Sequence, residues 1–77
     1  MRNKFMYRVY LLGLGHGCYS REYYREFVGT TWATSEKQAA NNMHYRLQQE
    51  GWRMPDTRVD SAGLGYVTYV LKAEKVA

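Results

Sequence analysis

The chain has 77 residues and a net charge of +4, with 45% hydrophobic residues, 23% charged residues and one proline. This length allows one small domain, 1–77, and the composition is globular, which excludes a disordered chain or a fibrous repeat. A domain of this size buries only about 60 to 65% of the surface of its unfolded chain, so a large enclosed active site would remove much of its core. We therefore expect a protein that is not an enzyme.

The excess positive charge belongs to the first third of the chain. Residues 1–25 hold five basic side chains and one acidic side chain, whereas 26–77 hold six of each. Half of the aromatic residues also lie in the first 25 positions. The functional surface is therefore expected on the N-terminal part of the domain.

The single cysteine, Cys18, cannot form a disulfide within the chain. The domain must therefore depend on its apolar core, which favours a reducing, cytoplasmic setting. Arg8 interrupts the N-terminal apolar run, so this run does not have the pattern of a signal peptide. No window approaches the roughly 20 apolar residues that cross a bilayer, and we expect a cytoplasmic protein that does not contact membranes.

Alternating side chains predict the first half of the sheet. Residues 4–12 are rich in aromatic and β-branched residues and predict a strand. Its core-facing residues are expected to be Phe5, Tyr7, Val9 and Leu11. Glycines at alternate positions within 13–20 predict a loop. A second strand is expected over 23–34, with the alternative that Ser20 caps a helical turn at its start.

The clearest local signal is a capping box formed by Ser35 and Gln38. The Ser35 hydroxyl can accept from the Gln38 amide, while the Gln38 side chain reaches back to the Ser35 amide. A helix is therefore predicted over 36–50, and Gly51 suits the left-handed conformation that ends a helix. The apolar stripe of this helix is expected to consist of Ala40, Met43 and Leu47.

The C-terminal part predicts two more strands. Trp52 is expected to fold back on the domain, and Pro55 marks a turn into a short strand at 57–60. A hairpin connection at 61–65 then leads into an alternating strand at 66–74. The expected order is β-β-α-β-β in a single α+β domain, an antiparallel-type sheet with one helix packed on one face.

One helix leaves the other face of such a sheet uncovered, and this face is the candidate site. The small residues Gly29, Thr31 and Ala33 would let the helix pack closely, so they are expected to face inward with Phe27. The open face is then expected to hold Met6, Arg8, Tyr10, Tyr24, Val28, Thr30 and Trp32. A one-residue slip would exchange the two faces, and a bulge at Gly29 would exchange them for half of the second strand.

Two segments carry a resemblance to known proteins. A W-A-x-S-x-x-x-A segment ending in Y-R-L resembles short uncharacterised proteins of Gram-positive bacteria and their phages, which implies a phage or mobile-element setting and no activity. Its matching residues are Trp32, Ala33, Ser35, Ala39, Tyr45, Arg46 and Leu47. The strand-to-helix junction is also similar to that of archaeal ribosomal protein LX. The matching positions there are Ala33, Ser35, Glu36 and Ala39.

Residue patterns for catalysis, metals and nucleotides are absent. The loop GLGHGC does not have the G-x-G-x-x-G spacing of a dinucleotide site. His16, Cys18 and His44 are too few for structural zinc and have no orienting group for nucleophilic catalysis. The acidic pairs at 22 and 26 and at 56 and 60 are interleaved with arginines and indicate surface ion pairs. We therefore expect no catalytic residue, metal, cofactor or small-molecule ligand.

Two hypotheses for function remain. The first is an interaction module that binds a protein partner or a second copy of itself, because tyrosine and arginine are enriched at interfaces. The second is a nucleic-acid-binding module, in which bases stack on aromatic rings and cations follow the phosphates. Both use the same candidate contact residues, namely Arg8, Tyr10, Arg21, Tyr24, Arg25 and Trp32.

Overall fold

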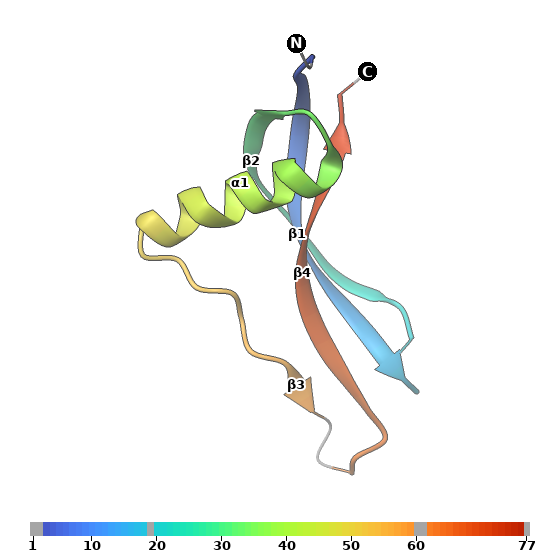
Figure 1. Cartoon of the computed structure of the whole chain (residues 1–77). Helices are drawn as coiled ribbons and strands as arrows, with labels where there is room; N and C mark the ends of the chain where they lie inside the picture. The colour runs from blue at the N-terminus through green and yellow to red at the C-terminus, as the bar shows by residue number, and fades with distance from the viewer. Residues whose placement is uncertain (1–2, 19, 60–61, 77) are drawn as a thin grey trace.

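The structure is a computed structural model that describes residues 3–18, 20–59 and 62–76. Figure 1 shows a helix lying across one end of a long, coiled sheet. Its elements are β1 (Phe5–Gly17), β2 (Glu22–Ala33), α1 (Glu36–Gln49), β3 (Arg58–Val59) and β4 (Gly65–Lys75). The strands lie in the order β2-β1-β4-β3 and every neighbouring pair is antiparallel. The expected β-β-α-β-β arrangement of a single α+β domain is therefore confirmed.

The first strand is longer than the alternation predicts. β1 continues through the glycine-rich segment, where Gly13 pairs with Tyr24 of β2 and with Tyr69 of β4. A Cβ atom at Gly13 would lie 3.0 Å from Cβ of Tyr24 and 3.2 Å from Cε1 of Tyr69. Glycine is used here for this close approach, so the prediction of a loop starting at residue 13 is wrong.

The second strand begins at Glu22, so no helical turn starts at Ser20. The Ser20 hydroxyl instead donates to the carbonyl of Gly17, 2.8 Å away, in the connection between the two strands. The predicted last strand also extends by one residue at each end, from Gly65 to Lys75. Of the short strand predicted at 57–60, Arg58–Val59 pair with β4, while residue 60 lies outside the described residues.

The helix begins at the predicted capping box, with one change of partner. The Ser35 hydroxyl accepts from the Gln38 amide at 3.1 Å, as expected. Gln38 Oε1 accepts from the amide of Thr34 at 2.6 Å instead of that of Ser35, so it reaches one residue further back. At the other end, Gly51 adopts φ +89° just after the helix. Trp52 then folds back, because its amide donates to Leu47 O at 2.9 Å and its ring lies edge-on to His44.

The core lies where the helix crosses the sheet. Met43 and Val9 are fully buried at its centre. The cluster of buried residues comprises Tyr7, Val9, Ala33, Ala39, Met43 and Ala73. Ala39 and not Ala40 is the buried alanine of the helix, which corrects the predicted stripe by one residue. The other end of the sheet extends beyond the helix, toward the β1–β2 and β3–β4 connections (Figure 1).

Candidate functional site

The face of the sheet away from α1, which we call the open face, is set by the strand register. Residues that pair across antiparallel strands lie on the same face, so the partners of Arg8 and Tyr10 belong to it. The open face holds Met6, Arg8, Tyr10 and Leu12 of β1, Arg25, Phe27, Thr30 and Trp32 of β2, and Val70, Lys72 and Glu74 of β4. Side chains from three strands therefore share this surface.

A bulge in β2 decides which residues reach the open face. Val9 pairs with Gly29 but the next residue, Tyr10, pairs with Phe27, so Val28 is the extra residue. Gly29 has φ +148°, and a Cβ there would lie 3.0 Å from Cε of Met43. Only glycine combines this backbone conformation with this closeness to the helix.

The bulge corrects the predicted faces for half of β2. Phe27 was expected in the core but lies on the open face, 55% exposed. Val28 was expected on the open face but is half-buried and packs against the core cluster. Beyond the bulge, the inward positions of Thr31 and Ala33 and the open position of Trp32 agree with the expectation.

Three aromatic residues of the open face, Tyr10, Phe27 and Trp32, form what we call the aromatic strip, with the Arg8–Thr30 pair between Trp32 and the other two. The Tyr10 and Phe27 rings meet edge to face, with their centroids 5.7 Å apart. Trp32 is 58% exposed, and it pairs across the strands with Met6. Large apolar side chains exposed together on an uncovered sheet face are typical of an interaction surface.

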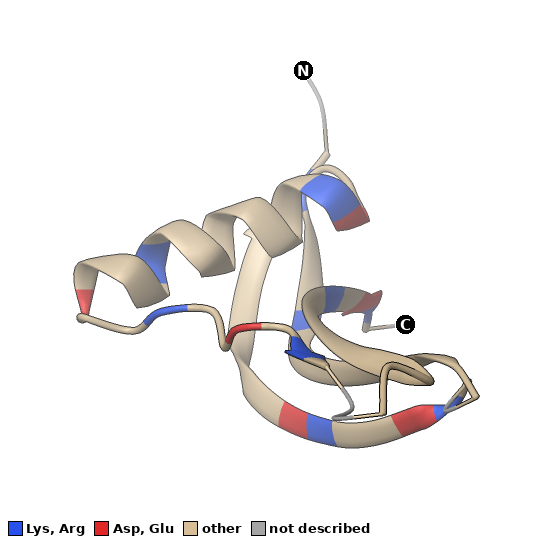
Figure 2. Ribbon diagram, turned by 90° about the horizontal axis from the view of Figure 1, so that it is seen from below, with Lys and Arg blue, Asp and Glu red and all other residues tan. Residues whose placement is uncertain are grey.

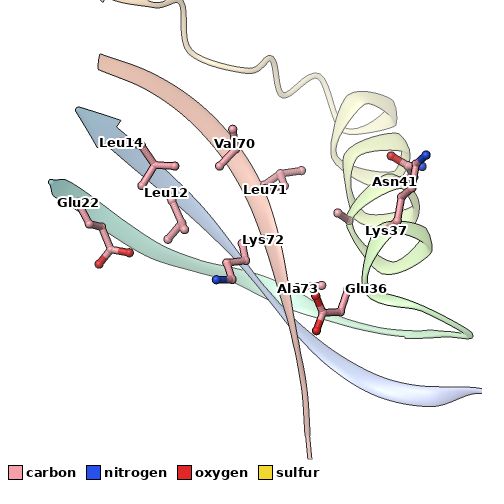
Figure 3. A pocket seen from close by; sticks show the side chains of 11 residues that line it. Leu12, Leu14, Glu22, Glu36, Lys37, Asn41, Val70, Leu71, Lys72 and Ala73 are labelled. Atoms are coloured by element: carbon pink, nitrogen blue, oxygen red, sulfur yellow. The ribbon is translucent and has the colours of Figure 1, made fainter. Parts of the chain in front are cut away.

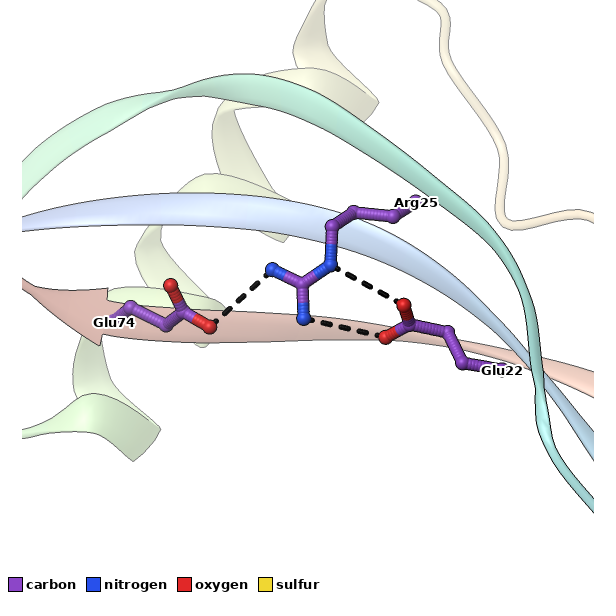
Figure 4. Close-up of polar contacts among 3 residues, drawn as sticks. All are labelled: Glu22, Arg25 and Glu74. Atoms are coloured by element: carbon purple, nitrogen blue, oxygen red, sulfur yellow. Dashed lines mark hydrogen bonds and ion pairs between the residues drawn. The ribbon is translucent and has the colours of Figure 1, made fainter.

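Arg25 lies beside the aromatic strip and is held by two carboxylates (Figure 4). One of its terminal nitrogens lies 3.2 Å from Oε1 of Glu22 and the other lies 3.3 Å from Oε1 of Glu74. Its guanidinium also stands over the Tyr10 ring, 4.9 Å from the centroid. The hydrogen bonds to Glu22 and then to Glu74 raise the pKa of Arg25. Its charge is balanced within the face.

The other two predicted cations do not take part in these ion pairs. Arg8 is opposite Glu74 in the register and, within residues 3–18, 20–59 and 62–76, makes no ion pair. Arg21 lies at the end of the β1–β2 hairpin, with its guanidinium 4.3 Å from the centroid of the Tyr23 ring. Figure 2 shows basic and acidic positions alternating along β2, so the predicted basic hairpin is not a continuous positive surface.

Tyr24 lies on the opposite face from Arg8, Tyr10, Arg25 and Trp32, because of the bulge. Its ring meets that of Tyr69 edge to face, with centroids 6.4 Å apart, and its hydroxyl donates to a Glu26 carboxylate oxygen. This hydrogen bond to Glu26 raises the pKa of Tyr24 above its usual value. The placement of Tyr24 on the open face is therefore corrected.

The open face thus brings together four of the six predicted contact residues and adds others. Arg8, Tyr10, Arg25 and Trp32 share the face. Arg21 lies at the β1–β2 hairpin, where its carbonyl accepts from the Gly15 amide, and neither it nor Tyr24 belongs to the open face. Phe27 was not among the predicted contact residues, although the alternative of a bulge at Gly29 places it on this face, and the carboxylates that hold Arg25 were missed. The signal for Phe27 was Gly29 within the strand, since an isolated strand glycine often marks a bulge.

No arrangement for metal binding is found in the described part of the chain, where no three His, Cys, Asp or Glu side chains come together. His16 is not a loop residue as expected, because it lies in β1, where its ring stacks on Tyr66 and its Nε2 is 2.9 Å from the Thr68 hydroxyl. Cys18 is exposed. The helix in the described part of the chain is neither long nor apolar enough to cross a bilayer.

Comparisons with known proteins do not place the chain in a family. No protein-family model, no curated protein and no solved structure matches it.

Proposed function

We propose that this protein is a non-enzymatic interaction module that binds a protein partner, or a second copy of itself, through the open face. The observation that carries this proposal is the aromatic strip, in which Phe27 and Trp32 are each more than half exposed on one uncovered surface. A standard interface buries about 800 Å² on each partner. The total accessible surface is 5676 Å², so such an interface would use roughly one seventh of it.

The charges of the open face favour a protein over a nucleic acid as the partner. Nucleic-acid affinity depends on cations that neutralise phosphates. Arg25, the cation beside the strip, is already neutralised by Glu22 and Glu74. A phosphate would have to displace these carboxylates before it could use this arginine. Nucleic-acid binding through Arg8 and Arg21 is the alternative, and its signature is a steep loss of affinity with salt.

Self-association and partner capture test the proposal with one pair of variants. Trp32→Ala shortens the strip, whereas Tyr45→Ala removes an aromatic ring that is 65% exposed on α1. Light scattering from about 10 μM to 1 mM measures the dimer. Affinity chromatography identifies partners that wild type and Y45A retain and W32A does not. We expect W32A to weaken the association by about tenfold or more, since truncated aromatic anchors cost 2 kcal/mol or more.

Two outcomes would contradict the proposal. One is that the wild type is a monomer at 1 mM and that wild type, W32A and Y45A all capture the same proteins. The other is a labelled single-stranded oligonucleotide that binds wild type and loses about tenfold or more in affinity between 50 and 200 mM salt. This second result would establish the nucleic-acid alternative.

A further inference from the structure

A second surface is the outer edge of β4, which is largely without a strand partner. One side of β4 pairs with β1 from Gly65 to Lys75. On its other side, β3 pairs only with Tyr66 and Val67. From residue 68 onward this edge has no neighbouring strand within the described ranges, although β4 lies inside the sheet order (Figure 1).

The hydrogen-bond pattern shows which backbone groups point outward along this edge. The amide of Val76 donates to the carbonyl of Met6 at 2.9 Å, so the residues of β4 in phase with Val76 bond to β1. The alternate residues Tyr69, Leu71 and Ala73 therefore direct their N–H and C=O groups away from β1. Val67 is another of these alternate residues, and its pairing with Arg58 of β3 agrees with this outward direction.

A groove with a volume of about 520 Å³ lies beside this edge (Figure 3). Its walls include Val70 and Leu71 of β4 and Lys37, Ala40 and Asn41 of α1. The groove has the size of a ligand pocket, which is typically about 300 to 1,000 Å³. Ala73 is only 3% exposed, whereas Tyr69 and Leu71 are half-buried, so the edge is accessible at these two residues.

The chain's own connection from α1 to β3 does not fill the groove. Trp52 is bound to the end of α1 through its amide and through its ring contact with His44. Since α1 has 14 residues, its two ends lie about 21 Å apart. The groove lies beside Lys37 and Ala40, in the first half of the helix. The connection leaves α1 at its other end and reaches β4 only at β3, away from the groove.

We infer that the edge of β4 at Tyr69 and Leu71 binds an extended, uncharged peptide segment of a partner protein as an added antiparallel strand. The outward N–H and C=O groups of these two residues supply the hydrogen bonds. The direction follows from β3, which occupies the same edge and is antiparallel to β4. The lining carries both signs of charge, because Glu36 lies beside Lys37 and Lys72, while Glu22 already pairs with Arg25. A segment of either charge would therefore meet a like charge in the groove, which favours an uncharged one.

The inference is tested with a capped, uncharged hexapeptide, acetyl-Ser-Val-Thr-Val-Thr-Ser-amide, added to the whole chain. On binding, we expect slower amide hydrogen exchange at Tyr69 and Leu71, because their N–H groups become bonded. Two N-methylated peptides, one modified at the second and fourth residues and one at the third and fifth, supply the control. Only one of them should lose about tenfold or more in affinity, because alternate amides face β4.

A variant that fills the groove gives a second readout. Ala40→Tyr places a ring between α1 and β4, whereas Gln48→Tyr adds the same ring on an exposed part of the helix. We expect A40Y to weaken peptide binding by about tenfold or more and Q48Y to leave it unchanged. We expect the W32A variant to bind the peptide as wild type does, because Trp32 does not line the groove. A failure of the peptide-binding inference can therefore be distinguished from a failure of the open-face proposal. The inference is overturned if the peptide does not bind wild type at 1 mM, or if the two N-methylated peptides bind equally.

Discussion

Gly29 is the residue on which the arrangement of the open face depends. Its φ of +148° belongs to the region that favours glycine, and it follows directly after the extra residue of the bulge. Met43, the largest fully buried side chain of the core, lies against it. One glycine thus lets the helix pack closely, and the bulge beside it reverses the expected direction of the β2 side chains from Tyr24 to Val28.

We predict that Gly29→Ala destabilises the fold by about 1 to 3 kcal/mol, through backbone strain and through contact with Met43. The control is Gly63→Ala, because Gly63 also has a positive φ, +71°, but a Cβ there would meet no atom within 4 Å. Urea unfolding of both variants measures the two free energies. A Gly29→Ala variant that is no less stable than Gly63→Ala would show that Met43 does not require this closeness.

Tyr24 makes a pH-dependent contribution to stability. Its hydrogen bond to Glu26 exists only while the phenol is protonated, so the pKa of Tyr24 is raised in the folded state. A raised pKa stabilises the fold below the pKa of the unfolded chain, near 10, and this contribution is lost as the pH rises through the folded pKa. We expect Glu26→Ala to lower the pKa of Tyr24 in an ultraviolet titration, with Tyr24→Phe identifying its signal. An unchanged titration in E26A would contradict this.

At the scale of elements, the helix depends on a cap that the sequence predicts well. The hydroxyl of Ser35 satisfies the Gln38 amide, one of the amides that have no partner inside the helix. We predict that Ser35→Ala costs about 1 kcal/mol, which lowers Tm by roughly 4 to 8 °C in a domain of this size. Ser35→Asp should restore most of the loss, since aspartate is an equally good cap. If S35D is as unstable as S35A, the cap is not the cause.

The strands show what local patterns can and cannot predict. Alternation predicted the strand at 66–74 correctly, and β4 pairs with β1 from Gly65 to Lys75 without a bulge. In β2 the same rule misplaced Phe27, Val28 and Tyr24, since the extra residue depends on Met43 of a distant helix. The length of β1 also depends on partners, because the rings beside Gly13 come from other strands.

The candidate site could be predicted in part for the same reason. That one helix leaves a face of the sheet open follows from counting elements, and Trp32 and Tyr10 lie on it as expected. The charge of this face could not be predicted, because Glu74 reaches Arg25 from 49 residues away. The positive charge of the first 25 residues is therefore a property of the sequence that folding partly neutralises.

At the scale of the whole molecule, which is 51 Å along its longest axis, the sheet has two unequal halves. The buried cluster and α1 stabilise the half around Val9, whereas the half around Gly15 has no helix over it. Both Val9 and Gly15 belong to the residues of β1 that bond to β2, and the Gly15 amide donates to Arg21 O at 2.7 Å. Since both amides bond on the β2 side of β1, a difference between their protection factors reports the packing of α1 over the strand and not the strand pairing.

We predict that the protection factor of the Gly15 amide is about tenfold or more lower than that of Val9, because openings of the less covered half need less free energy. Hydrogen exchange followed by NMR at low protein concentration measures this ratio. Equal protection of the Gly15 and Val9 amides in wild type would contradict the division of the sheet into two unequal halves, unless association of two molecules covers the half around Gly15. The W32A variant separates these explanations: if association is the cause, Gly15 becomes fast again once the aromatic strip is shortened, whereas a uniformly stable sheet stays equally protected.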